Sequence, residues 1–156
     1  MIDILKDVGQ FEIAMRLFSA VIGGAAIGLN RFLRHKSAGM RTHALTSLGA
    51  ALATMVALQI GDVEAASRVM QGLLTGVGFI GAGVIMRDGE SHVQGLTTAA
   101  SIWVCAVIGI ACGAGKMIIA MAVVIITLAV LILGRPLERG IARMAKDEKA
   151  ANDKGD

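Results

Sequence analysis

Five runs of apolar residues, separated by short polar connections, make up most of the chain. The runs cover residues 13–29, 43–60, 69–86, 96–113 and 117–133, so each is 17 or 18 residues long. That length is near the short end of what crosses the roughly 30 Å hydrocarbon core of a bilayer. The last four runs contain no charged residue. The pattern predicts five short transmembrane helices.

The first run carries one charged residue, Arg16, close to its start. Glu12 lies four residues earlier, and this spacing places both side chains on one face of a helix. We expect an ion pair at the membrane interface, with the long Arg16 side chain extended outward to water.

The composition agrees with a membrane protein. Apolar residues make up 55% of the 156 residues and charged residues 17%, against about 25% charged residues in soluble domains. We therefore predict an all-α, polytopic transmembrane bundle over residues 1–134 and a basic tail over 135–156. The first ten residues lack the basic region of a cleaved signal peptide, so we expect the first run to stay as an anchor.

The positive charges are distributed unevenly between the connections. Eleven of the 15 Lys and Arg residues lie in 31–43, in 87–95 and in the tail. Connections rich in Lys and Arg stay in the cytoplasm. We therefore expect a bacterial inner-membrane protein with its N-terminus outside and its C-terminus in the cytoplasm.

The tail has a helical pattern of its own. Leu137, Ile141 and Met144 recur at helical spacing, and the basic residues fall elsewhere on the helical wheel. A basic amphipathic segment next to a membrane span is expected to lie on the anionic inner leaflet. We interpret the tail as a partly helical orientation anchor.

Small residues recur at every fourth position in four of the five runs. The series are Ala20, Gly24 and Gly28; Gly49, Ala53 and Ala57; Gly72 and Gly76; and Cys105, Gly109 and Gly113. Such stripes let membrane helices approach closely, which predicts a tight bundle and leaves some stripes for subunit contacts. In the third run the glycines continue through Gly78, Gly81 and Gly83. Its GxGxxG spacing lies inside an apolar run, so we assign it to helix packing and not to dinucleotide binding.

Polar residues gather at the ends of the runs that we place in the cytoplasm. They are Asn30, Arg31, Arg41, Thr42, His43, Arg87, Thr97, Thr98 and Ser101. If the helices pack together, these groups form a basic vestibule suited to an anionic headgroup, a phosphate or an acidic partner residue. The alternative is that the basic residues of 31–41 only set the orientation of the chain.

A smaller polar cluster lies at the other end, formed by Asp62, Glu64, Arg68 and Gln71. Its two carboxylates are few for a divalent cation, which prefers six or more oxygen ligands. The cluster is therefore either a weak cation site or a solvated loop.

No catalytic motif is apparent in the sequence, and we expect neither an enzyme nor a cofactor nor a nucleic-acid partner. Cys105 and Cys112 lie seven residues apart on one helix, about 10 Å, which is too far for an unstrained disulfide. We interpret both as small packing residues. The runs also lack the buried carboxylate that is typical of proton-coupled carriers.

Four segments together resemble the MgtC/SapB family of small bacterial inner-membrane proteins. They are Ile27-Gly28-Leu29, Ala38-Gly39-Met40-Arg41-Thr42-His43, residues 76–83 (GVGFIGAG) and residues 95–103 (GLTTAASIW). The resemblance covers residues 14–134 in the same order and spacing. It implies a role in growth under magnesium limitation and, in pathogens, in survival inside macrophages. It implies regulation of other membrane proteins and of membrane energetics more than transport.

The chain departs from the family pattern in three places. The family has an acidic pair around an Arg after Gly-Leu, where this chain has Asn30-Arg31-Phe32. A family Gln falls one residue later than Gln71, whereas Arg68 matches a family Arg. Long members carry a soluble C-terminal domain, so with a tail of only 22 residues (135–156) this chain resembles the short form.

Two hypotheses follow from these observations. The first is a non-enzymatic regulatory protein in the bilayer that forms a homo-oligomer, a dimer in the first instance, and binds other membrane proteins. The second is a pathway for magnesium or a small solute, with the two polar clusters as its mouths.

Overall fold

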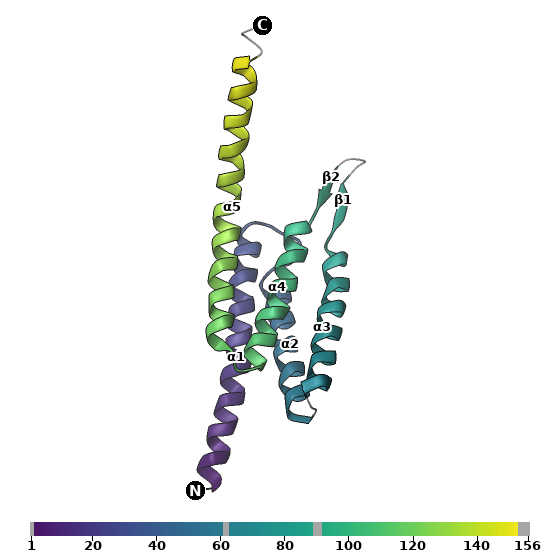
Figure 1. Ribbon diagram of the computed structural model, residues 1–156, viewed down its shortest axis with the longest axis vertical. Coiled ribbons are helices and arrows are strands. Elements are labelled where there is room, and N and C mark those ends of the chain that lie inside the picture. Colours follow the sequence, from purple (N-terminus) through teal and green to yellow (C-terminus); the bar gives the residue numbers. More distant parts are fainter. Residues whose placement is uncertain (1, 61–62, 89–91, 153–156) are drawn as a thin grey trace.

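The computed structural model describes residues 2–60, 63–88 and 92–152 (Figure 1). The described residues contain five helices: α1 (Ile2–Leu33), α2 (Met40–Ile60), α3 (Val63–Gly83), α4 (Leu96–Gly113) and α5 (Met117–Asn152). The predicted all-α bundle of five helices is therefore confirmed. The connection between α3 and α4, expected as a loop, also contains a short antiparallel pair, β1 (Met86–Asp88) and β2 (His92–Gln94).

Three helical segments in the described part of the chain are long and apolar enough to cross a membrane. They are Gly9–Leu33, Leu96–Gly113 and Met117–Glu138. Helices α2 and α3 have 21 residues each and run alongside the other three (Figure 1). Both helices contain polar residues, which include His43 and Ser47 in α2 and Glu64 and Arg68 in α3.

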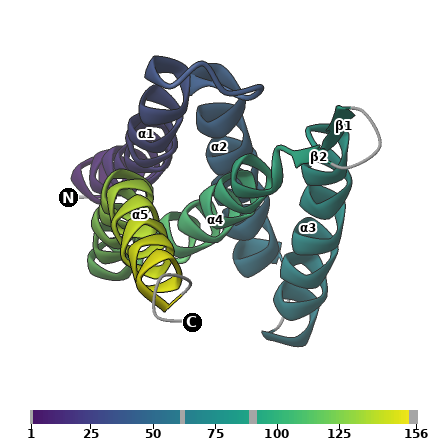
Figure 2. The same cartoon turned by 90° about the horizontal axis from the view of Figure 1, so that it is seen from above.

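The helices alternate in direction, so the two ends of the chain lie at opposite ends of the bundle (Figure 1). The α1–α2 connection, the β hairpin and the last part of α5 share one end. Helix α4 is central, because it contacts each of the other helices and nine of its 18 residues are buried. Helix α3 lies at the edge of the bundle, against α4 and α2 (Figure 2).

Glycines of α1 and α4 bring these two helices into backbone contact with α2. A Cβ atom on Gly24 of α1 would lie 2.5 Å from the carbonyl oxygen of His43, and one on Gly28 would lie 2.6 Å from the Cα of Met40. On α4, a Cβ atom on Gly109 would lie 2.1 Å from the carbonyl oxygen of Ser47. The predicted stripes of α1 and α4 therefore each make a close helix contact with α2.

The glycines of α3 behave differently from those of α1 and α4. Gly81 is buried, and a Cβ atom there would meet Ala99 of α4 at 3.5 Å. A Cβ atom on any of the other four would meet no atom of the described chain within 4 Å; these are Gly72, Gly76, Gly78 and Gly83. The packing contact expected for those four is thus not made among the residues that the structure describes.

Helix α3 ends three residues before the predicted end of the third run. The amide of Val84 donates to the carbonyl oxygen of Gly81 and that of Ile85 to Ala82, which tightens the last turn. The hairpin then returns to Gly95, whose φ of 94° is left-handed. A Cβ atom on Gly95 would lie 2.1 Å from the oxygen of Val84, so the start of α4 requires glycine at this position.

Helix α5 is longer than the fifth run. It continues through Pro136 to Asn152, and its last part extends beyond the bundle (Figure 1). The expected boundary at residue 134 is therefore not a break in the helix, and the tail is helical as far as Asn152.

Candidate functional site

A buried polar network joins α1, α2 and α4 at the end of the bundle that carries the hairpin. Arg31 of α1 is 3% exposed, and its Nη2 atom donates a 2.9 Å hydrogen bond to the Oγ1 atom of Thr98 on α4. The Oγ atom of Ser101, one turn further along α4, lies 2.7 Å from the carbonyl oxygen of Thr98. Arg31 is therefore held at α4 by a charge-assisted hydrogen bond.

His43 of α2 completes the network. Its Nδ1 atom lies 2.8 Å from the carbonyl oxygen of Gly39 and its Nε2 atom 2.9 Å from the Oγ atom of Ser101. The hydroxyl of Ser101 carries one hydrogen, so it donates either to His43 or to the carbonyl oxygen of Thr98. His43 has no exposed surface. The imidazole thus connects α2 to the same turn of α4 that holds Arg31.

Local backbone structure fixes the position of Arg31. The amide of Lys36 donates to the carbonyl oxygen of Arg31 and the amide of His35 donates to that of Phe32. This pair of bonds is a Schellman motif, in which the residue after the helix is left-handed. His35 takes that conformation with a φ of 51°. The motif ends α1 at Leu33, two residues after the side chain that enters the network.

Four of the nine residues predicted for the vestibule meet in this network: Arg31, His43, Thr98 and Ser101. Asn30 lies beside them and is half-buried, and its Oδ1 atom has no hydrogen-bond partner among the described residues. Arg41 and Thr97 are exposed, and no hydrogen bond or ion pair joins them to the described network. The vestibule is therefore smaller and more enclosed than the sequence predicts.

The predicted outer cluster does not assemble into a site in the described part of the chain. Asp62 lies outside the described residues. Arg68 forms an exposed ion pair with Glu64 at 2.9 Å, one turn away on the same helix. Gln71 is exposed, and its carbonyl oxygen accepts a hydrogen bond from Thr75.

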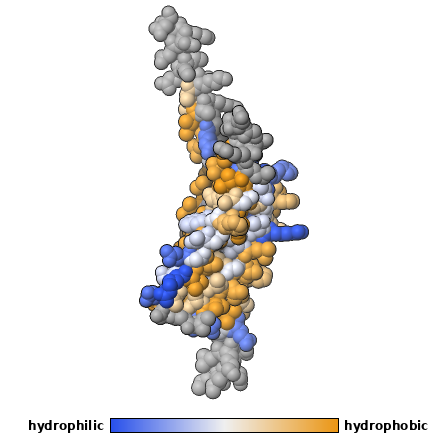
Figure 3. Space-filling view, turned by 90° about the vertical axis from the view of Figure 1, so that its right-hand side faces the viewer, coloured by the Kyte–Doolittle hydropathy of each residue, from blue (hydrophilic) through white to orange (hydrophobic). Residues whose placement is uncertain are grey.

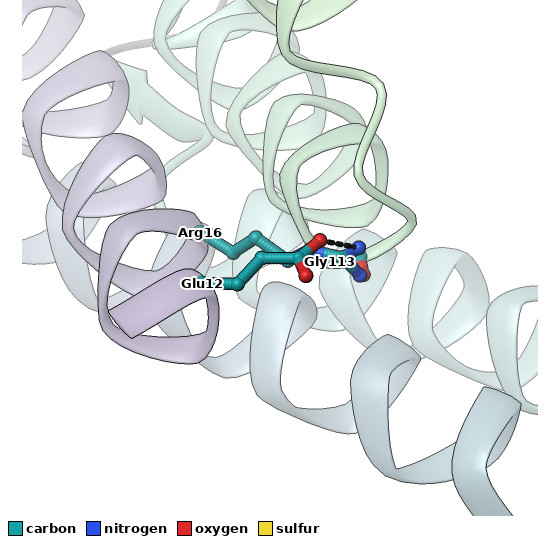
Figure 4. A network of polar contacts seen from close by, with 3 residues as sticks. All are labelled: Glu12, Arg16 and Gly113. Atoms are coloured by element: carbon teal, nitrogen blue, oxygen red, sulfur yellow. Dashed lines mark hydrogen bonds and ion pairs between the residues drawn. The ribbon is translucent and has the colours of Figure 1, made fainter. Parts of the chain in front are cut away.

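A contact that the sequence analysis missed lies at this end of the bundle instead (Figure 4). Arg16 pairs with Glu12, as the spacing predicts, through its Nη2 atom. Its Nη1 atom also donates a 2.9 Å hydrogen bond to the carbonyl oxygen of Gly113, the last residue of α4. The guanidinium of Arg16 thus also reaches across to a neighbouring helix, a contact that the spacing of Glu12 and Arg16 does not predict.

Arg16 completes the C-terminal cap of α4. The amide of Lys116 donates to the carbonyl oxygen of Ala111 and the amide of Gly115 donates to that of Cys112. Gly115 is left-handed, with a φ of 73°, so these bonds form a second Schellman motif. The carbonyl oxygen of Gly113 stays outside the motif, and a cation beside it also compensates the negative end of the helix dipole.

We expect Arg16→Ala to lower the free energy of unfolding by about 1–2 kcal/mol, since it removes a charged hydrogen bond at a partly buried helix end. Arg68→Ala is the matched control, because an exposed pair contributes about 0–1 kcal/mol. Thermal unfolding in detergent measures both. Equal thermal midpoints for the two variants would contradict the capping role of Arg16.

The remaining candidate groups are buried or dispersed. Cys105 and Cys112 are free and buried, which agrees with their interpretation as packing residues. No three His, Cys, Asp or Glu side chains come together in a metal-binding group within the residues that the structure describes.

Comparison with known proteins gives a consistent assignment. The sequence profile of the MgtC family matches residues 17–140. Protein SrpB of Synechococcus elongatus is 45% identical over 116 residues, which is 66% of this chain and 64% of that protein. Protein MgtC of Salmonella typhimurium strain LT2 is 39% identical over 135 residues, or 86% of this chain and 58% of the relative.

Protein MgtC of Brucella abortus strain 2308 is 38% identical over 121 residues, or 78% of this chain and 50% of the relative. The chain thus spans between half and two thirds of the length of these curated relatives. No solved structure matches the chain. The family profile matches most of the chain, including every residue of the buried network, so the chain belongs to the MgtC family.

Proposed function

We propose that this protein is a non-enzymatic regulatory protein of the bacterial inner membrane. It acts by contact with other membrane proteins during adaptation to low magnesium and, in a pathogen, during infection. Membership in the MgtC family supports this proposal. The end that carries the basic connections faces the cytoplasm in this proposal, because Lys and Arg are retained there.

The observation that best supports regulation by contact is that helix α3 has an exposed face of small residues. Gly72, Gly76 and Gly83 are spaced by four and seven residues, which places them on one side of a helix. All three are exposed and have open space at the Cβ position. Phe79, between them on the same side, is 84% exposed. Orange and pale residues cover most of the middle of the molecule seen from the α3 side (Figure 3).

Such a face fits another transmembrane helix better than it fits lipid. Glycine lowers helix stability by about 1 kcal/mol relative to alanine, and no atom of the described residues lies within 4 Å of a Cβ position on these three glycines. Elsewhere in the chain, Gly24 and Gly109 each allow the backbone of α2 to approach closely. We assign the α3 face to a helix of the regulated membrane protein. A second copy of this chain, giving a homodimer, is the competing occupant.

A second candidate function is passage of magnesium or a small solute. The observation in its favour is that three buried polar residues of α2, His43, Ser47 and Thr54, share one face. The Oγ atom of Ser47 has no hydrogen-bond partner among the described residues. His43 is bonded to Ser101, however, and Thr54 donates to the carbonyl oxygen of Ala50 in its own helix. Most of the polar face is thus already bonded, which favours a closed bundle.

The α3 face is tested by Gly76→Leu with Gly49→Leu as the matched control. Both glycines are exposed and have open space, but Gly49 lies on α2. In a strain that depends on this gene for growth in low magnesium, Gly76→Leu should abolish growth and Gly49→Leu should not, at equal protein level. Full growth of the Gly76→Leu strain would contradict the assignment. Disulfide cross-linking of two chains through Gly72→Cys would identify the occupant as a second copy.

A further inference from the structure

The last part of α5 presents a stripe of apolar side chains that nothing in the described chain covers. Leu133, Leu137, Ile141 and Met144 are between 54 and 74% exposed. With Pro136 and Gly140 they line an open groove of about 500 Å³. The apolar span of α5 ends at Glu138, so the stripe starts inside the membrane and continues past its edge. Exposure of such a stripe to water is unfavourable.

Basic residues occupy the helix positions opposite the apolar stripe of α5. Residues 135, 139, 143 and 146 are Arg, Arg, Arg and Lys. Steps of four, four and three residues place these positions on one side of an α-helix, roughly opposite residues 133, 137 and 144. An apolar face opposite a basic face, next to a membrane span, is the pattern of a helix that lies in the interface of a bilayer with anionic lipids.

The chain contains a point at which α5 can bend toward the membrane. Pro136 lies inside the helix, and it supplies no amide hydrogen for the bond to residue 132. Gly134 precedes it by two residues, and a Cβ atom there would meet nothing within 4 Å. Sharp bends in helices occur at such proline positions.

We propose that residues 133–146 form a membrane-surface segment that binds the anionic headgroups of the adjacent leaflet, with a bend at Gly134–Pro136. The apolar stripe enters the acyl region and the basic side meets the phosphate layer. The same segment of a second copy is a poorer occupant, because it brings an equal set of positive charges. The stripe is also about three helical turns long, shorter than the three to four heptads of a coiled coil.

The test uses the full chain in nanodiscs, with a nitroxide at Met144→Cys or at Ala142→Cys. These positions are two residues apart, so they share a depth but lie on opposite sides of the helix. Cys105 and Cys112 are buried and stay in place, with the unsubstituted chain as the labelling control. Collisions with oxygen report acyl surroundings, and collisions with a nickel chelate report water.

In discs that contain phosphatidylglycerol, the label at 144 should meet oxygen preferentially and the label at 142 the nickel chelate. In discs of phosphatidylcholine alone, the difference in accessibility between the two labels should be severalfold smaller. Arg139→Gln together with Arg143→Gln should reduce it in the anionic discs, whereas Arg68→Gln should not.

Three results would overturn the proposal. Nickel access at both positions would mean that the helix projects into water. Equal protection at both positions, or protection that is lost with one chain per disc, would mean that protein covers the stripe. A difference between the labels that is insensitive to lipid charge and to the Arg139/Arg143 substitutions would exclude recognition of anionic headgroups.

Discussion

Gly109→Ala is expected to disrupt the bundle. The added Cβ atom would lie 2.1 Å from the carbonyl oxygen of Ser47 and 2.9 Å from the Cβ atom of Ala50. The first of these atoms belongs to the backbone of α2, which cannot rotate away as a side chain can. Overpacking of a core costs about 1–3 kcal/mol and occasionally more, and a clash between helix backbones belongs at the upper end. Thermal unfolding in detergent and the yield of monodisperse protein measure the loss.

Gly76→Ala is the matched control for this substitution. Gly76 also lies inside a helix, but a Cβ atom there meets nothing within 4 Å. Its stability should stay equal or rise by up to about 1 kcal/mol, because alanine is the better helix former. If the two variants unfolded at the same temperature, the backbone contact between α2 and α4 would not be a main source of stability.

Arg31→Ala is expected to cost about 2–3 kcal/mol. Arg31 is buried and donates to Thr98, and hydrogen bonds to charged groups contribute about 1.5–3 kcal/mol. Arg41→Ala removes the same charge from an exposed position on the next helix, so its stability should change by no more than about 0.5 kcal/mol.

A double-mutant cycle with Thr98→Val separates the hydrogen bond from other effects of removing Arg31. Residues that share a hydrogen bond show coupling energies of about 0.5–3 kcal/mol. The double variant should therefore be more stable than the sum of the single effects predicts. Additive effects would show that Arg31 stabilises the bundle through contacts other than Thr98.

The helices were predictable because apolar length along the chain is sufficient to identify a membrane span. The residues at which the helices begin and end were less predictable, because they depend on the geometry of the turns. Helix α3 stops at Gly83, where hydrogen bonds from the amides of Val84 and Ile85 tighten the last turn, and the polar residues of the hairpin give no alternating pattern. The contact between Arg16 and Gly113 joins residues 97 positions apart, and nothing in the local sequence of either residue indicates the other.

The network was predictable in part for a similar reason. The sequence places Arg41 close to His43 and Thr97 next to Thr98, but a helix turns by about 100° per residue. Positions two residues or one residue apart therefore face different directions, and only His43 and Thr98 point inward. The phase of each helix depends on where its neighbours lie. The stripes show the same limit, since Gly28 and Gly76 have the same spacing pattern but only Gly28 meets another helix of the chain.

The central claim, regulation by contact and not by conduction, is tested most directly by magnesium flux into proteoliposomes that contain the purified, correctly inserted protein. Protein-free vesicles and the Arg41→Ala variant are the controls. The account predicts flux equal to that of the empty vesicles for both proteins. Flux above the empty vesicles that falls in the Arg41→Ala variant would contradict the account and would show that the protein conducts magnesium.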